Sequence, residues 1–219
     1  MKFKIIILSV SLSIISLFNV QAQTKFGLVG GINFQNLNGD DFQGDELDNN
    51  LLIGFHAGVN VLIPVAPDFY FSPGLLFSVK GASDEILGTT VTSRINYLEM
   101  PLNLVYRAKL GNGHVLLGFG PYMGYAISGK VKGEVGNTSA ERDIVFQNTI
   151  EPGDGAEAYL KRFDAGANIF FGYELEAGIF MQLNTQLGLV NIAPEDNSMT
   201  DDQTNIKNTG FGLSLGYRF

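Results

Sequence analysis

The feature that most constrains this chain is an alternation of side chains with a period of two residues, which recurs from about residue 26 to residue 219. The last segment shows it most clearly. There, glycine, serine and arginine alternate with the apolar residues Phe211, Leu213, Leu215, Tyr217 and Phe219. Successive side chains of a β-strand point to opposite faces of a sheet. Each segment therefore predicts a strand with one apolar face and one face of small or polar residues.

Eight segments of this kind occur, near residues 26–35, 53–63, 69–80, 94–109, 114–127, 163–175, 179–191 and 210–219. The third places Val79 on its apolar face. In the fourth the phase is blurred at Ile95 and Tyr97, which predicts a bulge or a barrel rim there. Pro101 predicts a local irregularity, because proline is tolerated in a sheet only at an edge or a bulge. After residue 22 no apolar run is long enough for a membrane helix, which needs about 18 residues.

The connections between these segments alternate in length. Long ones lie near residues 38–52, 81–93, 128–162 and 192–207, and short ones near 64–68, 110–113 and 176–178. Outer-membrane barrels have short periplasmic turns, long outer loops and an even number of strands. The sequence therefore predicts an all-β fold, an eight-stranded antiparallel up-and-down transmembrane β-barrel with both termini on the periplasmic side.

Aromatic residues at the strand ends fit two belts at the membrane interfaces. They are Phe26, Phe71, Tyr106, Tyr173, Tyr217 and Phe219 at one end, and Phe34, Phe55, Tyr125, Phe163 and Phe211 at the other. The opposite strand faces carry Gly, Asn, Gln and Ser, which suits a crowded polar lumen better than a solvated surface. The alternation alone also permits a soluble sandwich, or a lipocalin-like carrier in which Leu215 and Tyr217 point inward.

The first 22 residues have the features of a secretory signal peptide. Lys2 and Lys4 precede an apolar run over residues 5–18, and small residues precede a cleavage site after Ala22. A retained anchor is the alternative. The domains are then a signal peptide, 1–22, and a barrel domain, 23–219. Processing changes the net charge from −8 to −10, which leaves no basic footprint for nucleic acid.

Several stretches carry a family resemblance. Residues 97–102 read Tyr-Leu-Glu-Met-Pro-Leu, residues 163–175 and 187–192 are strand-like and glycine-containing, and the chain closes on Gly-Tyr-Arg-Phe at 216–219. These stretches resemble the fourth, sixth, seventh and last strands of the PorT-like outer-membrane barrels, also described as the outer membrane protein β-barrel domain family. The resemblance covers essentially the whole chain after residue 22. It implies an outer-membrane location, recognition of the Phe219 end by the barrel-assembly machinery, and a link to type IX protein secretion.

The inward faces bear charged residues that we expect to pair with one another, because an unpaired charge in a dry interior is strongly disfavoured. The candidates for this lumen polar network are Glu99, Arg107, Asp164, Glu174, Arg218 and His56, with Lys80 as a further inward charge. An eight-stranded barrel has room only for its own side chains, so a general-diffusion porin is not expected. No Gly-x-Ser-x-Gly elbow or His-Glu-x-x-His helix is present, and we assign no catalytic, cofactor or metal residues.

Seventeen of the 22 acidic residues fall in the long connections, which we interpret as solvated outer loops. The favoured function is a non-enzymatic structural, adhesion or accessory protein of the Gram-negative envelope. Its partners would be outer-membrane lipid, the barrel-assembly machinery through Phe219, and envelope or secretion proteins. Two alternatives stay open, an outer-membrane acyl hydrolase or protease and the soluble lipocalin-like carrier. The first requires a nucleophile and a base that converge, for which His56 is the inward histidine.

Overall fold

The computed structural model describes residues 24–86, 88–136, 138–199 and 201–219. The predicted signal peptide, with Lys2, Lys4 and the site after Ala22, lies outside these residues. The strands are β1 Lys25–Asp40, β2 Asn50–Ala66, β3 Phe69–Ile86, β4 Thr89–Leu110, β5 Gly113–Val135, β6 Thr138–Phe146, β7 Thr149–Ile150, β8 Ala158–Leu160, β9 Phe163–Leu175, β10 Ile179–Gly188, β11 Glu195–Asp196 and β12 Asn205–Arg218. No helix among the described residues has the length and hydropathy to cross a membrane.

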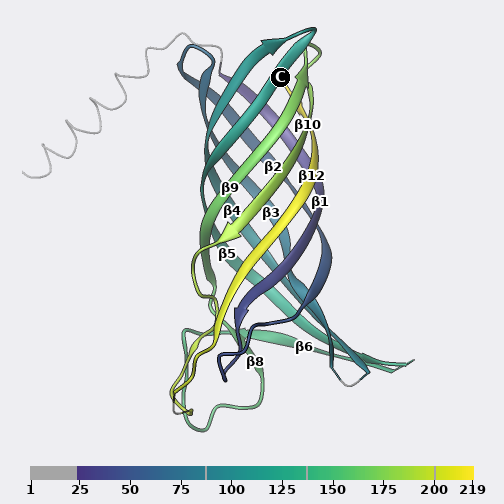
Figure 1. Cartoon of the computed structure of the whole chain (residues 1–219), viewed down its shortest axis with the longest axis vertical. Coiled ribbons are helices and arrows are strands. Elements are labelled where there is room, and N and C mark those ends of the chain that lie inside the picture. The colour runs from purple at the N-terminus through teal and green to yellow at the C-terminus, as the bar shows by residue number, and fades with distance from the viewer. Residues whose placement is uncertain (1–23, 87, 137, 200) are drawn as a thin grey trace, which may run out of the picture.

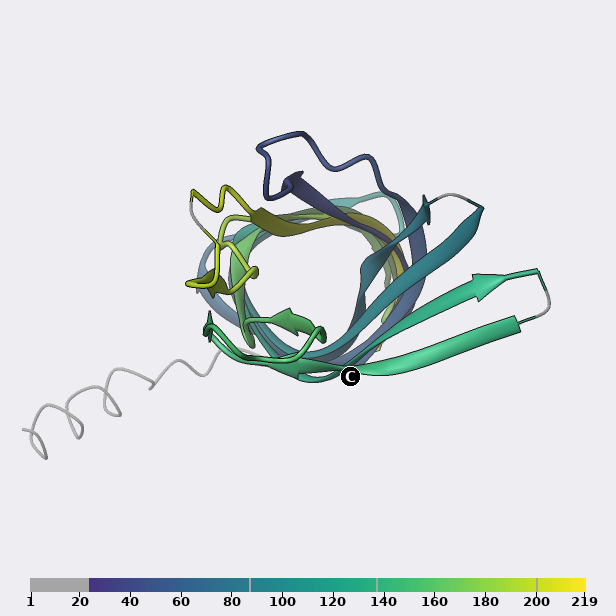
Figure 2. The ribbon, with the colours of Figure 1, turned by 90° about the horizontal axis from the view of Figure 1, so that it is seen from below.

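The main sheet contains ten strands and closes on itself. Antiparallel pairings form a ring in the order β1, β2, β3, β4, β5, β9, β10, β12 and back to β1. Outside this ring β6 pairs with β5, and β8 pairs with β6 in parallel. Figure 1 shows the ring as a tall barrel, and Figure 2 shows it along its axis. The predicted all-β, mostly antiparallel barrel is confirmed.

The apolar faces of the strands form the outer surface of the barrel. On β12, Leu215 and Tyr217 are 59% and 44% exposed, whereas Ser214 and Arg218 are buried. The same division holds around the ring, with exposed apolar side chains such as Phe26, Phe55, Phe119, Ile169 and Leu183. This facing contradicts the lipocalin-like alternative, in which Leu215 and Tyr217 would point inward.

The strand faces differ from the sequence prediction at several positions. Val79 is buried, although its segment placed it on the apolar outer face. Ile95 and Tyr97 point inward in phase with Glu99, and the strand pairing shifts by one residue between Asn96 and Tyr97 where β4 meets β5. The predicted bulge is therefore present. An apolar cluster at one end of the lumen takes up Ile95 and Tyr97, which explains why apolar residues lie on the inward face there.

Beside Pro101 the strand pairing is interrupted, as its residue type predicts: Met100 and Pro101 have no paired partner on β3, and Leu102 and Asn103 have none on β5. The register of β4 runs past Pro101 without a shift on either the β3 or the β5 side. Its ring is accommodated by Gly74 on β3, because a Cβ atom there would lie only 3.1 Å from Cγ of Pro101. The absence of a side chain on the neighbouring strand thus makes room for a proline inside a paired strand.

The two ends of the barrel differ in the length of their connections. At the short-turn end, tight connections join β2 to β3, β4 to β5 and β9 to β10. Each contains a residue with positive φ, namely Asp68, Gly111 or Gly178. This conformation is natural for glycine and tolerated by aspartate, so the turns are locally encoded. The backbone N–H of Phe219 donates to the carbonyl of Phe26, which places the C-terminus beside the start of β1 at this end.

At the long-loop end, two of the predicted loops are instead continuations of the barrel strands. β3 and β4 extend as a hairpin through the region predicted as loop 81–93, and β5 and β6 form a second hairpin within the predicted loop 128–162. β4 and β5 also stay paired out to Thr90 and Glu134. We call this four-stranded extension the flap, comprising residues 82–86, 89–94, 128–135 and 138–143. In Figures 1 and 2 the flap leans away from the barrel axis beyond the ring.

Glycines on the inward face make room for large side chains in the lumen. The aromatic rings of Phe170 and Phe180 lie where a side chain on Gly118 or Gly216 would stand, because a Cβ atom at either glycine would come within 2.2 Å of a ring carbon. Phe180 is completely buried. Large side chains in the lumen therefore pack against glycines on neighbouring strands, and the polar groups of the lumen lie among these packed side chains.

Candidate functional site

The charged residues of the lumen fall into two separate layers. The first lies near the short-turn end, where Glu174 on β9 receives two arginines. Arg107 Nη2 lies 2.8 Å from Glu174 Oε1, and Arg218 Nε lies 2.8 Å from Glu174 Oε2. Arg107 also contacts Nδ1 of His114 at 3.0 Å, and Arg218 donates to Asn60 Oδ1 at 3.3 Å. Because all three ionic side chains are at most 9% exposed, this layer closes the polar lumen at that end.

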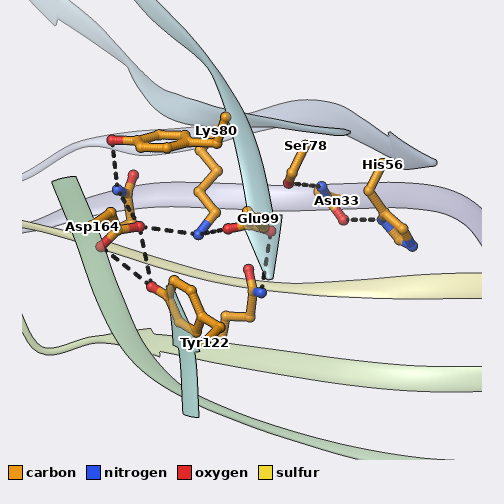
Figure 3. Close-up of polar contacts among 10 residues, drawn as sticks. Asn33, His56, Ser78, Lys80, Glu99, Tyr122 and Asp164 are labelled. Atoms are coloured by element: carbon orange, nitrogen blue, oxygen red, sulfur yellow. Dashed lines mark hydrogen bonds and ion pairs between the residues drawn. The ribbon is translucent and has the colours of Figure 1, made fainter. Parts of the chain in front are cut away.

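The second layer centres on Lys80, which projects from β3 into the lumen with no solvent exposure. Its ammonium forms an ion pair with Glu99 and another with Asp164 Oδ2, the latter at 3.2 Å. The same nitrogen lies 4.2 Å from the ring centroid of Tyr122 and 5.4 Å from that of Tyr97. Figure 3 shows Lys80 held between the two carboxylates.

Neutral donors complete the environment of Asp164. Asn208 Nδ2 donates to Asp164 Oδ2 at 3.0 Å, and the Tyr122 hydroxyl donates to the same oxygen at 3.2 Å. Gln186 approaches the other carboxylate, with Nε2 at 3.5 Å from Glu99 Oε2. Buried charges are tolerated only when partners satisfy them in good geometry. This layer meets that requirement with side chains from six different strands of the ring.

His56 belongs to neither ionic layer. Its Nδ1 lies 2.6 Å from Asn33 Oδ1, and its Nε2 lies 2.8 Å from Ser214 Oγ. Asn33 in turn donates to Ser78 at 3.3 Å, and Ser214 can donate to Asn184 at 3.0 Å. Figure 3 shows the chain from Ser78 through Asn33 to His56 beside the Lys80 layer. The structure thus brings a serine, a histidine and an amide together, with no carboxylate on the histidine.

Between the two ionic layers lies a small cavity of about 80 Å³. Its lining is mostly amide and hydroxyl groups, including Asn33, His56, Asn103, Gln182 and Ser214, together with Glu99 and Arg218 from the two layers. Pockets for small-molecule ligands usually measure about 300 Å³ or more. This cavity has room for several water molecules and not for an acyl chain or a sugar.

An apolar cluster closes the lumen at the long-loop end. Its buried members come from the barrel wall and from the connections, and they are Leu37, Ala82, Ile95, Tyr97, Ala126, Ile144, Leu160 and Ile192. Ile144 lies on β6, Leu160 on β8, and Ile192 between β10 and β11. The lumen therefore has an apolar plug at one end and an ionic layer at the other.

The sequence predicts which charged residues face the lumen but not how they divide. It predicts one network of Glu99, Arg107, Asp164, Glu174, Arg218 and His56, whereas the structure arranges these residues as two ionic layers and one neutral group. Tyr97, Tyr122 and Asn208 were not anticipated as partners. The sequence signal for them is spacing: Tyr97 is two residues from Glu99 on β4, Tyr122 is two from Gly124 on β5, and Asn208 is two from Gly210 on β12. Residues two apart on a strand share a face.

The plug residues Ile144, Leu160 and Ile192 were also missed, because they lie in stretches that the sequence assigns to outer loops. Isolated branched apolar residues inside otherwise polar connections were the only sign of them. Among the described residues, no group of three or more histidine and carboxylate side chains is arranged to hold a metal ion.

A family of known proteins agrees with the barrel architecture. The profile of a family described as outer membrane protein beta-barrel domain matches residues 21–193. Among solved structures, the chain is similar to the attachment invasion locus protein Ail of Yersinia pestis in complex with the heparin analogue sucrose octasulfate, with 13% identity, a TM-score of 0.41, and coverage of 90% of this chain and 99% of Ail. Another structure of Ail gives 14% identity, a TM-score of 0.40, and coverage of 89% and 98%. No curated protein sequence gives a match.

Proposed function

Because this chain belongs to the outer membrane protein β-barrel domain family, we propose that it is an integral outer-membrane protein whose lumen is closed to solutes and whose long-loop end makes its contacts. The observation that carries the proposal is the filled lumen. Two ionic layers and an apolar plug leave only the small cavity between them. In this proposal the ring of eight strands is the membrane wall, and β6 and β8 belong to the part outside the membrane.

The two unlike ends of the barrel support a proposed orientation in the membrane. We assign the short-turn end, with Phe26 and Phe219, to the periplasm and the long-loop end to the cell exterior. The alternation of short and long connections supports this assignment, because bacterial barrels place short turns in the periplasm. The terminal Phe219 is 68% exposed on the barrel surface, where an assembly factor could bind it.

The biological role that we propose is structural or accessory, without enzymatic activity. The likeness of residues 97–102 to the PorT-like signature supports a connection to type IX protein secretion. A deletion strain tests this connection directly: it should fail to export type IX cargo, and a plasmid copy should restore export. Normal export in the deletion strain would reject the connection and leave the outer-membrane assignment intact.

Four measurements test the closed outer-membrane barrel itself. The protein should fractionate with the outer membrane, require detergent for extraction, and migrate differently on gels before and after heating. In planar bilayers it should give no stepwise conductance, because the ionic layers and the plug block the lumen. Recovery in the soluble periplasmic fraction, or porin-sized conductance steps, would contradict the proposal.

A second candidate is favoured by one observation, the serine, histidine and asparagine that meet at His56. A hydroxyl, a general base and an orienting group are the elements of a nucleophilic hydrolase site. Ser214 and Asn33 occupy the required positions, at 2.8 and 2.6 Å from the ring nitrogens. However, all three side chains are buried and face the small cavity, so an ester has no path to Ser214.

An active-site probe separates the two candidates. A fluorophosphonate should fail to label Ser214 in the folded barrel, because the reagent cannot enter the lumen. A Ser214→Ala variant, which lacks the hydroxyl, is the negative control for labelling at this position. Covalent labelling that depends on both Ser214 and His56 would replace the structural role with a hydrolase.

A further inference from the structure

The outward face of the flap carries a hollow in which basic side chains gather. Thr92, Arg94 and Asn96 from β4 and Ser128, Gly129, Lys130 and Lys132 from β5 line it, together with Glu141 and Asp143 from β6. The hollow measures about 220 Å³. From these residues we infer that the hollow binds a phosphate group of an outer-leaflet lipid. This inference rests on the proposed outer-membrane location.

The register of the strands brings the basic residues together. Arg94 pairs with Lys130 across β4 and β5, and Thr92 pairs with Lys132. Directly opposite residues of an antiparallel pair have Cβ atoms about 4.5–5.5 Å apart, and residues two positions along a strand share its face. Lys130 and Lys132 can therefore contact one phosphate together. The guanidinium of Arg94 donates from Nη1 to the carbonyl of Ile53 on β2 at 3.4 Å, and it joins the two lysines by leaving this contact. Arginine and lysine are the residues that bind phosphate through charge-assisted hydrogen bonds.

The hollow is on the side of the flap that faces away from the lumen. On the same strands, Ile95 is part of the apolar plug and Val131 packs against it. Side chains alternate along a strand, so Arg94, Lys130 and Lys132 project to the opposite side. Asn96 and Ser128, which are hydrogen-bonded at 2.9 Å, continue this outward face toward the barrel.

The outward face leads directly into the apolar surface of the barrel. Leu98 and Tyr125 pair across β4 and β5 and are 45% and 54% exposed. Arg94 is four residues beyond Leu98, which is about 13 Å along an extended strand. A strand tilted by about 40° converts this to about 10 Å along the membrane normal. The basic residues thus stand just beyond the hydrocarbon boundary, where lipid headgroups lie.

The inclination of the flap turns this face toward the membrane surface. In Figures 1 and 2 the extended hairpins lean away from the axis and pass beyond the ring of the barrel. The face continuous with the lipid-contacting surface is then the one that overhangs the surrounding lipids. A phosphate carried by an outer-leaflet lipid fits this position better than one carried by a soluble ligand, because the apolar band next to it can contact the acyl chains.

Three carboxylates, Glu134, Glu141 and Asp143, compete with a phosphate for the cations of the hollow. Lys130 pairs with Glu141, and Lys132 lies 2.7 Å from Glu134. These side chains are 42–58% exposed, and exposed ion pairs contribute little stability. A phosphate with more negative charge can therefore displace a carboxylate. The three cations and the three carboxylates balance in formal charge, so a phosphate binds by replacing Glu141 and Glu134 as the partners of Lys130 and Lys132.

The test uses the full chain refolded in detergent micelles, with native mass spectrometry to follow the binding of diphosphoryl lipid A. The triple variant Arg94→Gln, Lys130→Gln and Lys132→Gln should bind at least tenfold more weakly. The matched control, Lys109→Gln, Lys161→Gln and Lys207→Gln, removes as many positive charges outside the hollow and should change affinity less than twofold. Glu141→Gln should bind several-fold more tightly, because it removes a competitor.

Further arms identify the source of the phosphate. Monophosphoryl lipid A should bind more weakly than the diphosphoryl form, and millimolar inorganic phosphate should compete poorly. Equal loss in the two triple variants would overturn the inference, and so would full competition by inorganic phosphate. Heat-dependent gel migration of every variant reports the folded barrel separately, so failure to insert into detergent rejects the proposed function rather than this site. If the triple variant does not fold, the single changes Arg94→Gln and Lys130→Gln replace it.

Discussion

Lys80 on β3 reaches across the lumen to Asp164 on β9, with 3.2 Å between Nζ and Oδ2. In the ring, β4 and β5 separate these two strands, so the contact ties together parts of the wall that share no backbone hydrogen bonds. Glu99 on β4 forms an ion pair with the same ammonium. The buried ammonium of Lys80 therefore links β3 to β4 and β9 at a depth where water does not reach it.

Removal of Lys80 should destabilise the barrel strongly. Lys80→Met leaves Glu99 and Asp164 buried without their cation, and a broken buried pair costs about 3–5 kcal/mol. Urea unfolding in lipid vesicles, followed by heat-dependent gel migration, measures the loss. Lys109→Met is the control, because its ammonium is 74% exposed and lies 3.9 Å from Glu176, so its removal should cost about 0–1 kcal/mol.

The neutralised triple variant Lys80→Met, Glu99→Gln and Asp164→Asn should recover most of that stability. It removes the unpaired charges and keeps the approximate volume of the three side chains. Equal destabilisation of the single and the triple variant would show that packing, rather than charge, dominates this layer.

The plug should depend on Ile192 in particular. Ile192→Ala removes a completely buried side chain from a cluster that bridges the wall and the loops, and such truncations cost about 2–5 kcal/mol. The same unfolding measurement tests it. Leu189→Ala serves as the control, because Leu189 is 62% exposed and its loss should have little effect. Equal effects of the two changes would contradict the plug.

The outer surface should respond to charge as a lipid-facing surface does. Leu183 on β10 is 63% exposed, so in water Leu183→Arg would be nearly neutral. In a bilayer an arginine near the midplane of a barrel costs about 2–4 kcal/mol. Leu110→Arg at the short-turn end is the comparison and should cost about 0–1 kcal/mol. Unfolding in vesicles distinguishes the two environments, and neutral behaviour of Leu183→Arg would argue against membrane insertion.

Lys130 should react slowly with amine acylating reagents. The hydrogen bond and the charge of Glu141 raise the pKa of the Lys130 ammonium above its usual value. Because only the neutral amine is nucleophilic, a raised pKa shifts the onset of acylation to higher pH. Mass spectrometry of labelled peptides should therefore find that modification of Lys130 begins at a higher pH in the unaltered protein than in Glu141→Gln. An unchanged profile in Glu141→Gln would contradict the ion pair.

The barrel was predictable because its main signals are local. Alternation along β9 and β12 determines which face is apolar. The short turns are specified by their own residues, because Asp68, Gly111 and Gly178 adopt positive φ. Inward charges could also be named, because Glu99 and Arg107 fall in phase on one strand. Which charged side chains contact one another depends on the register and stagger of the closed ring. The division into two ionic layers therefore could not be predicted from the sequence. The flap and the plug were missed because a polar strand that extends past the membrane looks like a loop.

The hydrogen bond from Phe219 to Phe26 and the long pairing of β1 with β12 have a consequence for biogenesis. The first and last strands are partners, so the seam of the barrel cannot seal until the end of the chain is available. A chain that stops before β12 leaves two unpaired sheet edges and lacks Asn208, Ser214 and Arg218, one contributor to each lumen assembly. The membrane wall can therefore close only once β12 pairs with β1, and a chain without β12 exposes the open edges of β1 and β10.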